Sequence, residues 1–149
     1  MKVLPTLEGG LKLMIDNDLD WQVLAMVSQD AGSGVSDELA DLMDEDAMWE
    51  DVVKPDLDAL FEDQLTKLNQ TIASAQQTGE DEVCIEPQDA DTWYGALNQA
   101  RLQLEKAYQL SKLREEGDLQ ALESEPRSAF FRDRFYCHLQ SLLLDYVME

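Results

Sequence analysis

Short segments of alternating apolar and polar residues mark the strands of this chain. Residues 11–15 read Leu-Lys-Leu-Met-Ile, so every second side chain adds to an apolar face, as in a half-buried strand. Residues 2–5 are separated from them by Glu8-Gly9-Gly10, where glycine supplies the positive φ of a tight turn. This pattern predicts an N-terminal β-hairpin. Val83-Cys84-Ile85 predicts a further strand near residues 82–86.

Elsewhere, apolar residues recur every three or four positions, which is the period of an amphipathic helix. Such stripes predict helices after Asp16, after Ser36, after Pro55, from Pro87 to Leu113, and after Pro126. Their apolar positions, in chain order, are Leu19, Val23, Met26 and Val27; Leu39, Leu42 and Met43; Leu57, Leu60, Phe61, Leu65, Leu68 and Ile72; Trp93, Leu97, Ala100, Leu104 and Tyr108; and Phe131, Phe135, His138, Leu142 and Tyr146. Leu139 and Leu143 widen the last stripe.

These elements predict a single α+β domain over residues 1–149. It is mainly α, with four or five helices packed with a small antiparallel sheet made of the hairpin and the strand near 82–86. Apolar residues make up 44% of the chain, which suffices for one well-covered core and not for two. This content also argues against disorder, because strongly charged chains stay unfolded only when apolar content is low.

The charge of the chain narrows the range of partners. There are 11 Lys and Arg against 32 Asp and Glu, a net charge of −21. Direct binding to nucleic acid or to an anionic membrane is excluded, because both need a basic surface. The excess is uneven, since residues 1–99 carry a net −19 and residues 100–149 a net −2. The exclusion of nucleic acid is therefore weaker for the final helix.

We expect a cytoplasmic protein. The longest uninterrupted apolar stretch is residues 23–27, whereas a membrane-spanning helix needs about 20 residues. Pro5 and Glu8 interrupt any signal-peptide apolar region. Cys84 and Cys137 lie 53 residues apart and form no Cys-x-x-Cys pair. In a reducing cytosol they are buried apolar residues or, alternatively, a redox switch.

Patterns for metal, phosphate and catalytic chemistry fail. Residues 16–20 resemble the start of a calcium loop, but Trp21 and Val27 occupy the positions that require glycine and an acid. One histidine and two separated cysteines do not make a zinc site, and the glycine pairs lack the lysine of a phosphate loop. His138, on an apolar stripe, is expected at the core or its boundary. No catalytic, cofactor-binding or metal-ligating residue is predicted.

The segment WYGALNQARLQL, from Trp93 to Leu104, carries a resemblance to a known family. Its Trp93, Ala96-Leu97-Asn98 and Arg101-Leu102-x-Leu104 resemble the motif of the bacterial domain-of-unknown-function family numbered two thousand and seventeen. The similarity covers most of residues 1–112, and residues 113–149 form a C-terminal helical segment outside it. The resemblance implies a small bacterial cytosolic protein without an established enzyme activity.

The same motif suggests a structural clamp made of Trp93, Asn98 and Arg101. Trp93 lies on the apolar stripe, while Asn98 and Arg101 lie beside it. A partly buried Arg101 needs a carboxylate or carbonyl partner. The alternative to a clamp is a direct role of these residues in binding a partner.

Two surfaces are candidates for contact with another protein. One is the acidic run of residues 41–51 with its embedded Met43, Met48 and Trp49, residue types favoured at adaptable interfaces. The other combines arginines with nearby aromatic residues in the final helix, namely Arg127, Arg132 and Arg134. Alternatively, the acidic run is a solvated surface and the arginines meet acidic groups of the same molecule.

The sequence thus favours a non-enzymatic protein-interaction or regulatory module that needs no cofactor. Its partner is an unknown protein, for which a basic surface is one option, and the chain is a monomer or a homodimer. Two alternatives remain open. One is a nucleic-acid mimic that occupies a basic DNA-binding protein, and the other is an enzyme with an unrecognised site.

Overall fold

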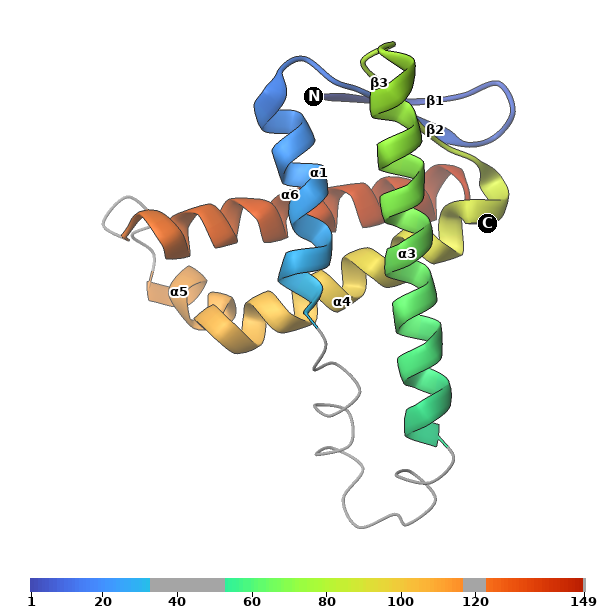
Figure 1. The fold of residues 1–149 in the computed structure, drawn as a ribbon. Coiled ribbons are helices and arrows are strands. Elements are labelled where there is room, and N and C mark those ends of the chain that lie inside the picture. Colours follow the sequence, from blue (N-terminus) through green and yellow to red (C-terminus); the bar gives the residue numbers. More distant parts are fainter. Residues whose placement is uncertain (33–52, 117–122, 149) are drawn as a thin grey trace.

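The computed structural model describes residues 1–32, 53–116 and 123–148. This part of the chain forms five α-helices and a three-stranded antiparallel sheet, which confirms an α+β fold that is mainly α (Figure 1). In chain order the elements are β1 (Lys2–Pro5), β2 (Leu11–Met14), α1 (Asp18–Ala31), α3 (Lys54–Thr78), β3 (Glu82–Ile85), a short 3₁₀ turn (Pro87–Asp89), α4 (Ala90–Tyr108), α5 (Leu110–Glu116) and α6 (Ser124–Tyr146).

The sheet has the order β1-β2-β3, and the predicted hairpin and third strand are confirmed. Leu13 of β2 lies opposite Val3 of β1 on one side and Val83 of β3 on the other. Both Leu13 and Val83 are fully buried, so this face of the sheet covers the core. At the start of β2 a Cβ on Gly10 would lie 2.2 Å from the backbone oxygen of Ile85. Only glycine therefore lets β2 approach β3 this closely.

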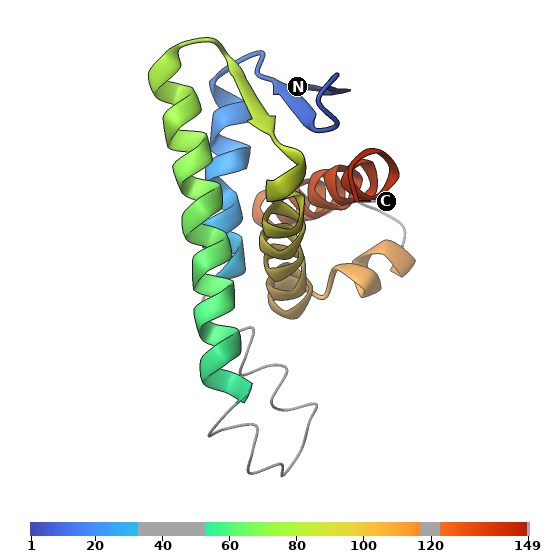
Figure 2. The ribbon, with the colours of Figure 1, turned by 90° about the vertical axis from the view of Figure 1, so that its right-hand side faces the viewer.

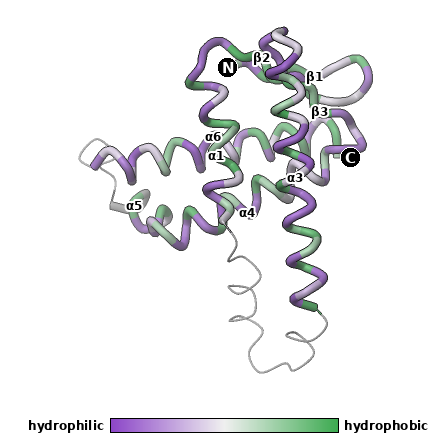
Figure 3. The backbone as a smooth tube through the Cα atoms, viewed as in Figure 1, coloured by the Kyte–Doolittle hydropathy of each residue, from purple (hydrophilic) through white to green (hydrophobic). Residues whose placement is uncertain are grey.

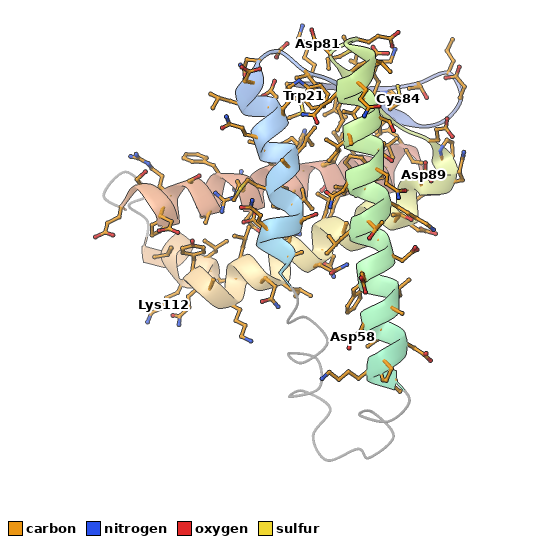
Figure 4. The ribbon with its side chains drawn as sticks, in the orientation of Figure 1. Trp21, Asp58, Asp81, Cys84, Asp89 and Lys112 are labelled. Carbon is orange, nitrogen blue, oxygen red and sulfur yellow. The ribbon has the colours of Figure 1, made fainter. Side chains whose placement is uncertain are left out.

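The helices form two crossed layers. In Figure 1, α1 runs down from the sheet and α3 runs back up to it, while α4 and α6 cross behind them. Figure 2 shows α4 and α6 nearly end-on. Helix α4 packs against α1, α3 and α6, and its predicted stripe of Trp93, Leu97, Ala100 and Leu104 is buried. Trp21 of α1 is half-buried against the same core and lies toward α3 (Figure 4). Helix α4 is thus the centre of the domain.

The helix predicted from Pro87 to Leu113 is wrong at its end, because the chain breaks at Gln109. This residue adopts the left-handed conformation, with φ 52° and ψ 53°, and its N–H donates to the backbone oxygen of Glu105. The carboxylate of Glu105 then accepts a hydrogen bond from the backbone N–H of Ser111. The break directs Leu110 into the core, where it is only 1% exposed. Burial of this leucine explains why the helix does not continue.

Other predicted stripes are only partly correct. In α1 the buried residues are Leu24, Val27 and Ala31, whereas Leu19 is exposed. In α3 only the later turns are buried, and Leu60 is 49% exposed. The first turns of α3 extend beyond the other helices in Figure 2. The helix predicted after Ser36 lies outside the described residues.

Candidate protein-binding surface

Helix α6 has two apolar faces, and the stripe predicted to lie in the core is only partly buried. Apolar and polar positions alternate along this helix in Figure 3. The face turned to the interior carries Ala129, Phe130, Asp133, Tyr136, Leu139, Gln140 and Leu143. The predicted stripe lies to its side: Phe131, His138 and Tyr146 are exposed, and Phe135 and Leu142 are half-buried. Leu139 and Leu143, which widen the predicted stripe, are buried as expected. The rest of the core face was not predicted because it includes two polar residues.

Those two polar residues bind Arg101 of α4. The Nε atom of Arg101 donates to Oδ1 of Asp133 at 3.0 Å, and its Nη1 donates to Oε1 of Gln140 at 2.8 Å. The amide of Gln140 in turn donates to the backbone oxygen of Tyr94 at 3.3 Å. A buried polar group is tolerated only when it is hydrogen-bonded, and here each group has a partner. The arrangement ties α6 to α4.

The other two residues of the proposed clamp occupy different surroundings. Trp93 is buried in the core, whereas Asn98 lies on the exposed side of α4. The buried amide is that of its neighbour Gln99, which donates to the side chain of Gln64 at 3.0 Å and to the backbone oxygen of Phe61 at 3.2 Å. The structure therefore brings Arg101 together with α6 and directs Gln99 toward α3.

A second polar cluster ties α6 to α1. The guanidinium of Arg132 donates to both carboxylate oxygens of Asp30, at 2.8 and 3.0 Å, and the hydroxyl of Tyr136 donates to the same carboxylate at 2.6 Å. The Asp30 side chain is 5% exposed. The hydrogen bonds to Asp30 raise the pKa of Arg132, and burial together with the bond to Asp30 raises the pKa of Tyr136. Each charge in the cluster is thus held by a geometrically matched partner.

Beside this cluster, α1 and α6 form an open groove of about 510 Å³. Its apolar lining comes from Met1, Val23, Phe131 and Phe135, and Phe131 is 60% exposed. Its charged lining consists of Arg127, Arg132 and Asp20. Met1 lies at the edge of the groove with its amino group 2.9 Å from the carboxylate of Asp16. An exposed phenylalanine in a concave apolar surface is a typical anchor for a protein partner. We call the side of α6 that carries Phe131, Phe135 and Leu142 the outer face.

The three predicted arginines of this helix differ in their environments. Arg132 is engaged by Asp30, and its Nη1 also donates to Ser128 at 2.9 Å. Arg127 lines the groove, and both Arg127 and Arg134 are exposed. Among the side chains that the structure describes, no carboxylate lies within ion-pair distance of Arg127 or Arg134. These two guanidiniums are therefore available to a ligand.

The remaining predicted positions give no further site. Met43, Met48 and Trp49 lie outside the described residues. Cys84 is exposed, so the expectation that it is a buried apolar residue is wrong, and Cys137 is half-buried. Both are free thiols, and desolvation and the nearby Glu82 raise the pKa of Cys84. In the part of the chain that the structure describes, no His, Cys, Asp and Glu side chains gather in a group able to hold a metal ion. No helix among the described residues is long and apolar enough to cross a membrane.

Several residues that organise this surface escaped sequence-based reasoning. Asp30 lies 102 residues before Arg132 in the chain, and no local pattern relates the two. Asp133 and Gln140 did offer a signal, because a spacing of seven places two polar residues on the same side of a helix. Because they lie on the same side of the helix as the apolar Tyr136 and Leu143, they are expected to be buried. Buried polar groups need hydrogen-bond partners, so this pattern indicates a polar or cationic side chain on a neighbouring helix.

The fold and the groove define a small helical domain built around α4, with one apolar helix face left open. The chain belongs to the family described as domain of unknown function DUF2017, whose model matches residues 40–147. The match includes the C-terminal segment that lay outside the resemblance, and it begins after the hairpin and α1. Asp30 therefore precedes the matched region while its partner Arg132 lies inside it. No curated protein and no solved structure matches the chain.

Proposed function

We propose that this protein is a non-enzymatic interaction module that binds a protein partner through the outer face of α6. The observation that carries the proposal is Phe131, which is 60% exposed in a groove that is also lined by the half-buried Phe135 and Val23. Keeping a large aromatic side chain in water forgoes about 2 kcal/mol of burial free energy, which becomes available on binding. Alanine scans of interfaces place most binding energy on such aromatic and arginine anchors.

The rigidity of the helix supports this role. Residues 132 and 133 of α6 are hydrogen-bonded to α1 and α4, so the outer face is presented on a backbone fixed from two sides. A preordered surface loses little conformational entropy when it binds. We extend the proposal to a regulatory protein of the bacterial cytosol, the setting that the resemblance at Trp93 to Leu104 implies.

Site-specific crosslinking tests the proposal. Phe131 is replaced by the photoreactive analogue benzoylphenylalanine in cells that express the protein, and the same analogue is placed at Leu60 of α3 as a matched control. Leu60 is also a large exposed apolar residue, but it lies on another helix. We expect a discrete crosslinked protein from position 131 and none from position 60. The same crosslinks from both positions, or none from position 131, would contradict the proposal.

A further inference from the structure

The outer face of α6 combines its exposed aromatic residue with two positive charges. Arg127 precedes Phe131 by four residues and Arg134 follows it by three, so all three side chains leave the same side of the helix. All three residues are exposed. The result is an apolar anchor with a guanidinium about one turn away in each direction along the helix.

Among the arginines whose side chains the structure describes, these two differ from Arg101 and Arg132 in having no acidic partner within the described residues. Arg101 and Arg132 are each paired with a carboxylate, at 3.0 and 2.8 Å. Within the described residues, Arg127 and Arg134 have no such pair, although the chain holds 32 acidic residues against 11 basic ones. A guanidinium binds a carboxylate with two parallel hydrogen bonds, which makes it specific for this group.

We propose that the outer face binds an acidic segment of the partner, in which an apolar side chain lies between two carboxylates. The apolar side chain packs against Phe131 and Phe135, and the carboxylates pair with Arg127 and Arg134. This inference rests on the proposed function and adds the chemistry of the partner to it. A basic segment is disfavoured because it would bring like charges together at both arginines.

The net charge of −21 does not conflict with an acidic ligand. At physiological ionic strength, exposed charges are screened beyond about 8 Å, so the contact depends mainly on the charges at the groove. These include the carboxylate of Asp20, which is paired with the amino group of Met1 at 3.5 Å. The acidic remainder of the chain repels an anion at longer range and slows its approach. Affinity therefore has to come from close contact with Phe131 and the two arginines, which makes their removal easy to detect.

Selection from a library of displayed random twelve-residue peptides tests the inference at about 150 mM salt. Peptides that bind the unmodified protein are counter-selected on Phe131→Ser, so that only ligands of the outer face remain. We expect enrichment of Asp and Glu on both sides of an apolar residue. Phe131-dependent peptides that are basic or uncharged would overturn the inference while leaving the proposed function intact. No Phe131-dependent peptide at all would overturn both.

The affinities of the selected peptides for variants of the protein then test whether Arg127 and Arg134 bind the carboxylates. The double variant Arg127→Gln/Arg134→Gln is expected to weaken binding about tenfold, the effect of two surface ion pairs of moderate strength. Lys106→Gln and Lys112→Gln remove exposed positive charges from α4 and α5 and are expected to change binding less than twofold. Figure 4 shows Lys112 on α5, outside the outer face.

Equal effects of all these variants would overturn the assignment of the carboxylates to Arg127 and Arg134. Thermal unfolding of each variant checks that the fold is intact, which is expected because the substituted residues are exposed. Sedimentation of the protein without peptide tests whether a second copy of the chain occupies the outer face. A dimer that is lost in Phe131→Ser would show that a second copy of the chain covers the outer face, and it would overturn the inference.

Discussion

Arg132 and Asp133 are neighbours in the chain, yet their side chains bind different helices. Arg132 pairs with Asp30 of α1, and Asp133 pairs with Arg101 of α4. Successive side chains of a helix project about 100° apart, so two adjacent residues can reach two helices on either side. Together, these two ion pairs fix the rotation of α6 about its own axis. This rotation leaves Phe131, and with it the outer face, directed toward solvent.

Removal of one partner of the pair between α4 and α6 should destabilise the domain. Arg101→Met leaves Asp133, whose side chain is 9% exposed, without its cation. Since Arg101 itself is one-third exposed, we expect a loss of about 2 kcal/mol in the free energy of unfolding, less than for a fully buried pair. Urea denaturation of Arg101→Met, Asp133→Leu and the double variant measures this.

The double variant is the control for the mechanism. If the cost comes from an uncompensated charge, Arg101→Met/Asp133→Leu should be more stable than Arg101→Met alone. Strictly additive losses would show that the two residues do not stabilise the fold as a pair.

The two adjacent phenylalanines of α6 should respond differently to truncation. Phe130 is 4% exposed and Phe131 is 60% exposed. We expect Phe130→Ala to lower the free energy of unfolding by about 3 kcal/mol, because it leaves a cavity in the core. Phe131→Ala should change it by less than about 0.5 kcal/mol, as usual for a surface substitution. Thermal or urea unfolding distinguishes the two, and similar losses would mean that the outer face is part of the core.

Tyr136 should make the fold sensitive to alkaline pH. Burial and the hydrogen bond to Asp30 raise its pKa in the folded state above the ordinary value of about 10. Above pH 10 the unfolded chain therefore releases the proton while the folded protein keeps it, so the free energy of unfolding falls as the pH rises. Below pH 10 the contribution is fully present.

Absorbance at 295 nm and urea denaturation between pH 8 and about 11 follow these two effects. Tyr136 should ionise only together with unfolding. Tyr136→Phe should lose about 1 kcal/mol at neutral pH through the missing hydrogen bond, and its stability should decline less steeply with alkaline pH. An unchanged alkaline slope in Tyr136→Phe would show that other groups cause the dependence.

The helix break at Gln109 predicts a stabilising substitution. A residue with a Cβ loses about 1 kcal/mol in the left-handed conformation, which glycine adopts without strain. Gln109→Gly should therefore raise the midpoint of thermal unfolding by a few degrees. Lys106→Gly, three residues earlier within α4, should lower it by a similar amount because glycine weakens a helix interior. Shifts of the same sign in both variants would contradict the role of the break.

Local sequence patterns determined much of the fold. The hairpin and β3 follow from alternation of apolar residues and from the glycines at positions 9 and 10. The stripe from Trp93 to Leu104 identified the central helix correctly, since every apolar residue of that stripe faces a neighbouring element. Such patterns are reliable where a helix or strand has one apolar side, because burial then allows a single orientation.

The tertiary structure alone decided what α6 presents to solvent. Its sequence contains two apolar stripes, and the one with Phe131 and Leu142, widened by Leu139 and Leu143, was predicted to face inward. The other stripe is buried instead, because Asp133 and Gln140 satisfy Arg101 there and Arg132 reaches Asp30 across 102 residues. The apolar pattern of one helix cannot reveal partners on distant helices. Hydrogen bonds between helices thus determine which of the two apolar faces of α6 is buried, which its apolar pattern alone does not.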